Sequence, residues 1–171
     1  ETRTFRESGQ IFASIVYGSE SNFNLCCGNN FISVASLNYT NFVIGYTDGT
    51  VDYPDKYGKV IVGETSDISV SWIAESTFVS GQYDGTTSLS VSSLNSSYFV
   101  VAYRDSTDNF KGKARVGAIS GSSIIWGTES IFNPASTDYV HTSSLNSTHF
   151  VVAYIDTQED SFNVAIGRVS G

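Results

Sequence analysis

The chain repeats one sequence pattern three times along its 171 residues, and this constrains its fold more than any other feature. The motif Phe-Val-Val-Ala-Tyr-x-Asp spans residues 99–105 and recurs with small changes at 42–48 and 150–156. An internal period of about 50 residues indicates an architecture in which each repeat packs on its neighbours.

Each repeat contains four short segments rich in Val, Ile, Tyr, Phe and Ser, bounded by Gly, Asn, Asp and Ser. Such segments are typical of strands, and helix signals are absent. Four antiparallel strands per repeat are the pattern of β-propeller blades. We therefore predict an all-β chain of three four-stranded, propeller-like repeats in one domain, 1–171. Its parts are an arm at 1–12 and repeats at approximately 13–63, 69–117 and 123–169.

Three motifs together resemble the propeller-like repeats of large secreted or surface proteins from aquatic microbes, algae and their viruses. They are Phe-Val-Val-Ala-Tyr-x-Asp, Gly-Lys-Ala-x-Val-Gly-x-Ile-Ser-Gly and Ile-x-Trp-Gly-x-Glu-x-x-Phe, and they are clearest within residues 93–133. The resemblance implies an extracellular scaffold or adhesive module. It does not imply an activity, which must be argued from a site.

The last repeat lacks its own fourth strand, whereas a segment of that type, Ser14 to Phe23, precedes the first repeat. We expect this N-terminal strand to complete the last repeat, in the same chain or in a neighbouring one. Three arrangements remain open. They are a three-bladed ring, two chains sharing a six-bladed ring, and an open unit that receives its missing strand from a neighbour.

Each repeat carries an N-glycosylation acceptor at the same place, after Ser-Leu. The three acceptors are Asn38, Asn95 and Asn146, each followed two residues later by Thr or Ser. Glycosylation at these sites requires the secretory pathway. We therefore predict N-linked glycans and an extracellular or cell-surface location.

Cys26 and Cys27 are adjacent and are the only two cysteines. A strained disulfide between them, two intermolecular disulfides and two free thiols remain open, with some disulfide favoured by an oxidising compartment. Neither metal-ligand spacing nor a Cys-x-x-Cys motif is present.

The formal net charge of −8 argues against a nucleic-acid partner or an anionic membrane surface. The sequence has no apolar stretch of about 18 residues, so no membrane span is predicted. Glu1 begins directly in a polar segment. For a secreted protein, we expect this to be the processed form or a fragment.

Asp48, Asp105 and Asp156 each begin an acidic loop, and Ca²⁺ takes oxygen ligands from such loops. The spacing of the later acidic residues differs among the three loops, and no EF-hand pattern is present. We therefore predict that these aspartates shape turns. Ca²⁺ remains an alternative, and no other metal or cofactor is predicted.

No set of residues suggests catalysis. His141 and His149 flank one turn, and Glu20, Glu75 and Glu129 occupy one repeated position, which suits architecture better than a single active site. Nucleophile, phosphate-loop and paired metal-ligand motifs are absent. We predict that the chain is not an enzyme.

Tyr17, Trp72 and Trp126 also share one repeated position. We expect their rings to pack between sheets, although aromatic rings also stack on sugars. The predicted function is an extracellular structural glycoprotein that binds copies of itself in a fibre or surface layer. The alternative is a glycan-binding, lectin-like propeller module.

Overall fold

The structure is a computed structural model that describes residues 3–7, 10–24, 31–49, 56–80 and 86–170. The described residues form strands and no helix, and therefore contain no helix long and apolar enough to cross a membrane. The strands are β1 (Arg3–Glu7), β2 (Gln10–Ile15), β3 (Ile32–Ser36), β4 (Asn41–Asp48), β5 (Tyr57–Ser66), β6 (Ser69–Ser80), β7 (Thr86–Ser93), β8 (Tyr98–Asp105), β9 (Lys111–Ser120), β10 (Ser123–Trp126), β11 (Ser130–Ser144), β12 (His149–Asp156) and β13 (Ser161–Arg168).

Strands β3 to β6 form one four-stranded antiparallel sheet in chain order, which we call the first unit. It contains the four expected segments in sequence. Its fourth strand, β6, comes from the segment around Trp72 at the beginning of the second repeat. The first unit therefore takes its outer strand from the beginning of the following repeat.

The other seven main strands form one continuous sheet, because β11 belongs to two groups of strands. The first half of β11, Ser130 to Ser136, pairs with β9, and β10 pairs with the remainder of β9. The second half, Thr137 to Ser144, pairs with β12. The second unit is therefore β7, β8, β9 and an outer edge made of β10 and the first half of β11. The third unit is the second half of β11, β12 and β13.

Serine side chains join the first strands of the three units, β3, β7 and β11. In β7, Ser88, Ser90 and Ser92 accept hydrogen bonds at Oγ from backbone N–H groups of β11, at 2.8, 3.0 and 2.8 Å. Ser33 of β3 accepts one in the same way from the N–H of Val91 at 3.1 Å. Adjacent units are thus held in register by polar bonds between their first strands.

Apolar residues fill both junctions between units. Between the first and second units, Val43, Val60 and Val62 pack with residues of β7 and β8 such as Val91 and Phe99, all of them buried. Between the second and third units, the core contains Val100, Ala102, Ala114, Val140, Phe150 and Val152. The core is therefore divided into layers between sheets.

The expected all-β fold with antiparallel sheets is confirmed, whereas three separate four-stranded sheets are not what the structure shows. The third unit has three strands, and it shares β11 with the second unit. Its outer strand is β13, which pairs with β12 alone.

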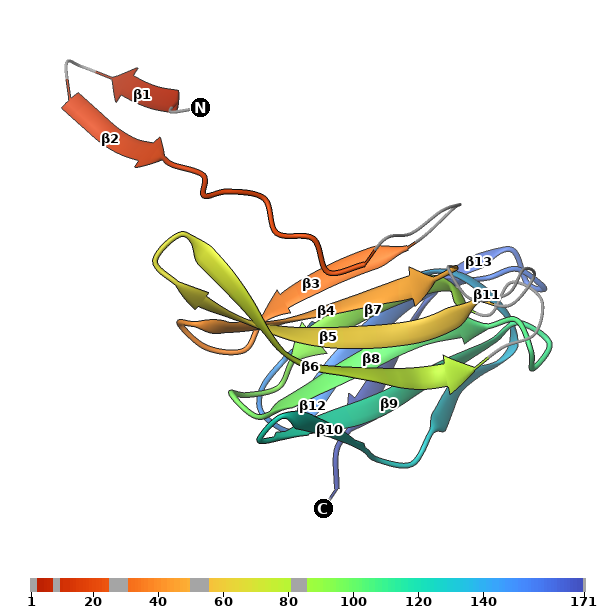
Figure 1. Cartoon of the computed structure of the whole chain (residues 1–171). Helices are drawn as coiled ribbons and strands as arrows, with labels where there is room; N and C mark the ends of the chain where they lie inside the picture. Colours follow the sequence, from red (N-terminus) through yellow and green to blue (C-terminus); the bar gives the residue numbers. More distant parts are fainter. Residues whose placement is uncertain (1–2, 8–9, 25–30, 50–55, 81–85, 171) are drawn as a thin grey trace.

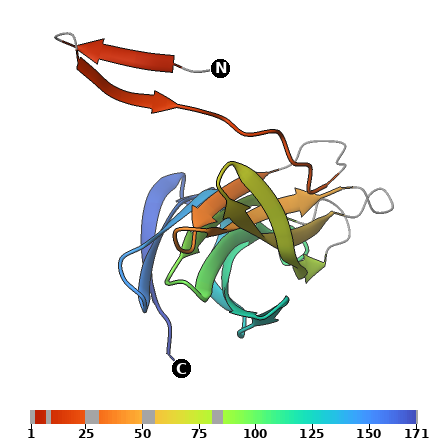
Figure 2. The same cartoon turned by 60° about the vertical axis from the view of Figure 1, so that its left-hand side comes forward.

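The N-terminal segment also differs from expectation. Residues 16–24 contain no strand, and the strand nearby, β2, pairs with β1 in a hairpin. Figures 1 and 2 both show this hairpin lying apart from the three units, at the end of an extended segment. A strand needs a partner edge. Within the single chain only Ser14 and Ile15 of the expected segment find one, on β1, and residues 16–24 pair with neither β1 nor β13.

Candidate functional site

A group of three aromatic rings recurs on the units. On the first unit, Phe23 contacts Tyr46 and Trp72, with ring centroids 5.1 and 5.4 Å apart. On the second unit, Phe78 contacts Tyr103 and Trp126 at 4.9 and 5.8 Å. In both groups the phenylalanine comes from the segment that precedes the unit, and the tryptophan comes from the outer strand of the unit.

The third unit holds only two of the three rings. Phe132 contacts Tyr154 with ring centroids 5.0 Å apart, in the same way as Phe23 contacts Tyr46 and Phe78 contacts Tyr103. The tryptophan of the earlier units has no counterpart there in the described residues, because the strand that would carry it is missing from this sheet.

Each tryptophan also covers a phenylalanine that lies over a glycine. Trp126 pairs across the sheet with Gly117, whose other cross-strand partner is Phe99. The Trp126 and Phe99 rings meet edge to face, at 5.6 Å between centroids. In the third unit, Phe150 lies over Gly167 in the same way, but no tryptophan of the described residues covers them.

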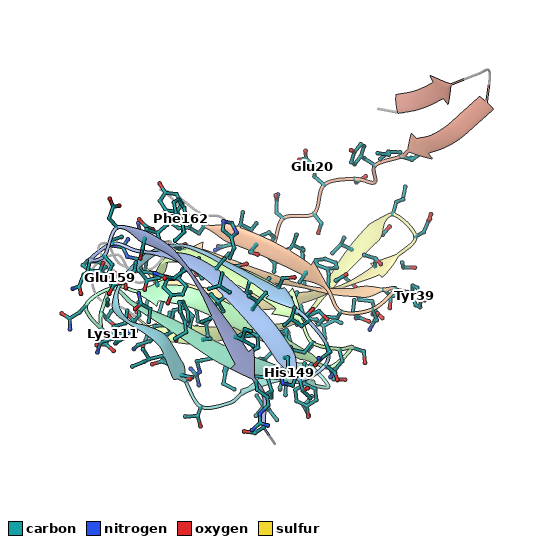
Figure 3. All side chains as sticks on the ribbon, turned by 180° about the vertical axis from the view of Figure 1, so that it is seen from behind. Glu20, Tyr39, Lys111, His149, Glu159 and Phe162 are labelled. Carbon is teal, nitrogen blue, oxygen red and sulfur yellow. The ribbon has the colours of Figure 1, made fainter. Side chains whose placement is uncertain are left out.

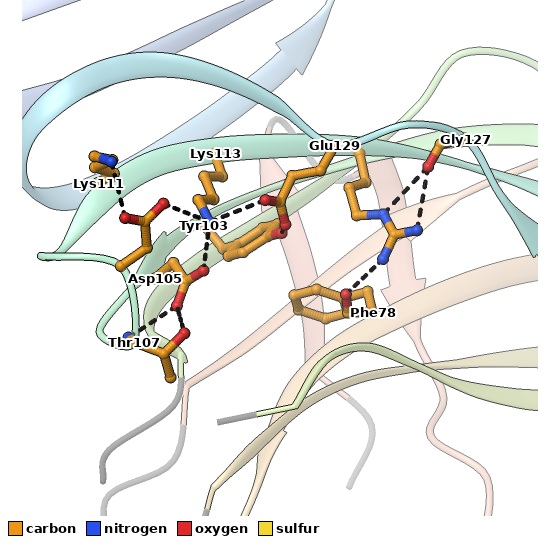
Figure 4. A network of polar contacts seen from close by, with 10 residues as sticks. Phe78, Tyr103, Asp105, Thr107, Lys111, Lys113, Gly127 and Glu129 are labelled. Carbon is orange, nitrogen blue, oxygen red and sulfur yellow. Dashed lines mark hydrogen bonds and ion pairs between the residues drawn. The ribbon is translucent and has the colours of Figure 1, made fainter. Parts of the chain in front are cut away.

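A cluster of charged side chains lies beside the aromatic group of the second unit (Figure 4). Lys113 is buried and contacts three carboxylates, those of Asp105 at 2.8 Å and of Asp108 and Glu129 at 2.9 Å each. Tyr103 donates a hydrogen bond to Glu129. The first unit repeats this arrangement with Lys59, whose Nζ lies 2.7 Å from Asp48 and 3.0 Å from Glu75.

The pKa values of Lys113 and Tyr103 are both raised in this cluster. Burial alone disfavours the charged form of Lys113, but hydrogen bonds to the surrounding carboxylates outweigh burial and raise its pKa. Burial, then the hydrogen bond to Glu129 and its negative charge, raise the pKa of Tyr103. Both groups are therefore held in their protonated forms at neutral pH. Each of the three carboxylates in this cluster contacts Lys113, and Glu129 also accepts the hydrogen bond of Tyr103.

The third unit has only part of the polar cluster. Tyr154 and the buried Asp156 keep their places, but Asn163 pairs across the strand with Tyr154, where Lys59 and Lys113 pair with Tyr46 and Tyr103. In the part of the chain that is described, no carboxylate accepts a hydrogen bond from Tyr154. The third unit thus lacks the glutamate of the outer strand as well as the tryptophan.

A groove of about 780 Å³ lies beside Phe150 and Gly167, where the tryptophan is missing. We call it the third-unit groove. Its lining includes Trp126 and Ser130 on the second unit and Phe150, Gly167 and Val169 on the third. It runs between the outer edge of the second unit and β13.

The opposite face of β13 is apolar and exposed. It carries Phe162, Val164 and Ile166, and we call it the β13 face; Phe162 is 89% exposed. Figure 3 shows Phe162 on this strand, with Glu20 on the extended N-terminal segment. At the other end of the array, Ile32 and Val34 of β3 are each 64% exposed.

The predicted glycosylation sites lie in three identical turns. Asn38 Oδ1 accepts hydrogen bonds from the N–H groups of Thr40 and Asn41, both at 2.9 Å. Asn95 and Asn146 make the same two bonds, and all three asparagines are exposed. This geometry explains the asparagine by turn formation. Each side chain also lies at the surface, where a sugar can be attached. The turn geometry does not test glycosylation, which stays a prediction.

The aspartates proposed as alternative Ca²⁺ ligands bind amides and lysines. Asp105 accepts from the N–H of Thr107 at 2.9 Å, and Asp156 accepts from the N–H of Gln158 at 2.9 Å. Asp48 pairs with Lys59. Among the described residues, no group of three or more His, Cys, Asp or Glu side chains is placed to hold a metal ion.

The remaining residues singled out in the sequence, two histidines, three aromatic residues and two cysteines, are located as follows. His141 is exposed on β11, and His149 begins β12 with Nδ1 2.9 Å from the Thr148 hydroxyl. Trp126 packs between the sheets of the first and second units, as expected. Trp72 instead lies on the outer face of the first unit against Phe23 and Phe42, and Tyr17 is 70% exposed, so neither of these two rings packs between sheets. Cys26 and Cys27 lie outside the described residues.

Sequence reasoning missed the third-unit groove and the serine bonds between units. The groove had a signal, the unequal number of fourth-strand segments, but its lining depends on packing between distant repeats. The serine bonds had a weaker signal in the alternation Ser88-Leu-Ser90-Val-Ser92.

No family model and no curated protein matches this chain. Its structure is similar to a chain from an analysis of two prolyl endopeptidases and their inter-domain dynamics, with a TM-score of 0.51 and 13% sequence identity. The similarity covers 83% of this chain and 20% of that one, so this chain spans about a fifth of its neighbour's length. At this identity the likeness shows the fold alone, an all-β, propeller-like arrangement of antiparallel sheets.

Proposed function

We propose that this chain is a non-enzymatic structural glycoprotein of the extracellular space or cell surface, and that its copies join end to end in a fibre or surface layer. The observation that carries this proposal is that the array of units is open at both ends, with complementary apolar faces. The third unit ends in the β13 face, and the first unit begins with exposed Ile32 and Val34.

The junction between the first and second units supports this pairing of the two exposed faces. By position in the repeat, Val164 and Ile166 correspond to Val60 and Val62 of the first unit. Ile32 and Val34 correspond to two residues of β7, Leu89 and Val91. Those counterparts are buried against each other at the junction between the first and second units. The same two types of surface stay exposed only at the ends.

Exposed apolar faces of this kind mark interaction surfaces. Because the two faces differ, their contact is heterologous, and such contacts generate filaments when they do not close into a ring. The three exposed sequon turns support the extracellular setting, since a sugar attached there has room in the solvent. The carboxylates of Glu75 and Glu129, engaged by tyrosine and lysine, support a structural role for these residues.

The alternative function, a glycan-binding module, has one observation in its favour. A groove of about 520 Å³ on the β13 face is lined by Tyr139, Phe162, His141 and Asn163, among others. Aromatic rings beside polar groups could bind a sugar. The β13 face would therefore bind a second copy of the chain in the proposed function and a glycan in the alternative.

Negative-stain electron microscopy and sedimentation velocity of the full chain test the proposal. We expect filaments or ordered layers, which the triple substitution Phe162→Ser, Val164→Ser, Ile166→Ser abolishes. All three side chains are exposed in the isolated chain, so the variant should keep its thermal stability. The matched control is Tyr39→Ser, which removes an exposed ring from a turn and preserves the acceptor at Asn38. A full chain that stays monomeric at high concentration and binds glycans on an array would overturn the proposal and favour the alternative.

A further inference from the structure

We infer that the third-unit groove is the binding site for Tyr17 of a second copy of this chain, whose residues 14–22 pair with β13 as its missing fourth strand. This inference rests on the proposed function, and it deepens it by naming the occupant and the register. It begins from the aromatic position that the first two units fill and the third does not.

The groove has the lining that receives the tryptophan in the earlier units. Trp126 lies edge to face with Phe99 over Gly117, and its Nε1 donates to the hydroxyl of Ser76, on the outer strand of the preceding unit, at 3.0 Å. In the third unit, the counterparts of Phe99, Gly117 and Ser76 are Phe150, Gly167 and Ser130. All three line the groove.

Tyr17 is the residue that matches this position. It stands where Trp72 and Trp126 stand in their segments, three residues before a glutamate and six before a phenylalanine. It is 70% exposed, and its neighbours Ile15 and Val16 are exposed as well. An aromatic ring with two apolar neighbours in an exposed, extended segment loses contact with water when it enters such a groove.

The register follows from the earlier units. Trp72 pairs with Gly63 and Trp126 pairs with Gly117, so Tyr17 pairs with Gly167. This alignment brings Glu20 to the Tyr154 hydroxyl, as Glu75 is brought to the hydroxyl of Tyr46 at 2.8 Å. This single placement therefore supplies both the aromatic ring and the glutamate that the third unit lacks.

The occupant comes from a second copy because the segment already lies on the first unit of its own chain. Phe23 packs on Tyr46 and Trp72, as Phe78 packs on Tyr103 and Trp126. A third unit docked beside it continues the interface that joins the units within the chain, with the β13 face against Ile32 and Val34. Those faces are exposed here, so the single chain does not close on itself.

Photo-crosslinking of the full chain tests this inference, with p-benzoylphenylalanine replacing Tyr17 in one isotopic population mixed with a second population. We expect crosslinks between the two populations that mass spectrometry maps to peptides containing Phe150, Gly167 or Ser130. The same probe at Tyr39, on an exposed turn, is the control and should give no such crosslink. Crosslinks confined to one chain would overturn the second copy in favour of a closed ring.

A matched pair of substitutions gives an independent result. Tyr17→Ser should raise the concentration needed for assembly about tenfold or more, because an aromatic ring leaves the interface, whereas Tyr17→Trp should preserve assembly. Neither should change the melting temperature of the monomer. Filaments with unchanged assembly in Tyr17→Ser, or crosslinks that map elsewhere, would overturn the inference and leave the proposed function intact. The absence of any assembly by the unmodified chain would overturn both.

Discussion

The ring of Phe99 lies over Gly117, its direct partner across β8 and β9, and a Cβ atom placed on Gly117 would come within 2.2 Å of the ring. The same pair occurs in the first unit, as Phe42 over Gly63, and in the third, as Phe150 over Gly167. Because Phe99 is completely buried, its ring has no room to withdraw. The glycine is therefore required by the close approach of the ring.

The substitution Gly117→Ala should lower the free energy of unfolding by about 1–3 kcal/mol, since it overpacks this junction. Urea denaturation followed by tryptophan fluorescence measures the effect. The control is Gly127→Ala, where the nearest atom to the new Cβ is the Val116 carbonyl oxygen at an ordinary 3.4 Å. Its effect should stay within about 0.5 kcal/mol. Equal effects at the two glycines would contradict the packing argument.

Lys113→Met should destabilise the chain by about 3–5 kcal/mol, because it leaves the buried carboxylate of Asp105 without its cation. Thermal and chemical unfolding both report this loss. Lys59→Met is the matched control in the first unit. Its side chain is 23% exposed, against 8% for Lys113, so water can replace part of its contribution and the loss should be smaller. A larger loss of stability for Lys59→Met than for Lys113→Met would contradict the argument that side-chain exposure sets the size of the effect.

Stability should fall as the pH rises above about 10. The pKa of Tyr103 is raised above its ordinary value of 10.0, and the pKa of Lys113 is raised above 10.5. A raised pKa in the folded state means that the stabilisation is complete below the unfolded-state pKa and is lost as the pH rises toward the folded-state pKa. We expect the urea midpoint to be constant from pH 7 to 9 and to drop above pH 10.

Tyr103→Phe isolates the tyrosine contribution to this alkaline loss. The variant should be less stable at pH 8 by about 1.5–3 kcal/mol, the typical worth of a hydrogen bond to a charged group. Its midpoint should then fall less steeply above pH 10. Tyr39→Phe, on an exposed turn, should follow the unmodified chain at every pH. Identical slopes for the unmodified chain and Tyr103→Phe would contradict the assignment.

Protein from its native source should carry N-linked glycans at Asn38, Asn95 and Asn146. Intact mass before and after treatment with a peptide N-glycosidase measures this directly. In a secreting host, Thr40→Ala, Ser97→Ala and Thr148→Ala should each remove one glycan and leave the other two. Unmodified asparagine at all three positions in native protein would remove the glycan prediction and the main support for secretion.

Asn163→Lys should strengthen assembly. Lysine occupies this position in the first two units and binds the glutamate of the outer strand, so the introduced ammonium group would meet the incoming Glu20 as well as Asp156. We expect the assembly concentration to fall roughly fivefold, equivalent to about 1 kcal/mol. Ser122→Lys adds the same charge on an exposed turn of the second unit and should have little effect. Equal gains from both variants would indicate a general effect of net charge.

The sequence predicted the positions of the middle strands well, because hydrophobic content and turn residues are local signals. Strands β4, β8 and β12 coincide with the repeated Phe-to-Asp motif, and Trp126 packs between sheets as expected, whereas Trp72 does not. Within the single chain, the expected strand from Ser14 to Phe23 does not form beyond Ile15. A strand forms only against a partner edge, and the local sequence does not specify which edge that is; pairing with a neighbouring chain stays a prediction. The signal for the β1–β2 hairpin was Ser8-Gly9 between two short runs with apolar residues.

The candidate site was predictable in outline and not in detail. Counting segments showed that the third unit would lack a strand. The contact of Phe132 with Tyr154, and the place of Ser130 beside Phe150, depend on how the second and third units pack. The sequence repeat shows which residues of the third unit correspond to which residues of the second. It does not show that corresponding residues touch, which is known only from the contacts within a complete unit.

The passage of β11 through two units has a mechanical consequence. One strand is hydrogen-bonded along its first half to β9 and along its second half to β12, with no loop between. Tension along the array therefore loads backbone hydrogen bonds of the sheet itself and cannot open a hinge between these units. The second and third units should therefore yield together under force, as one body.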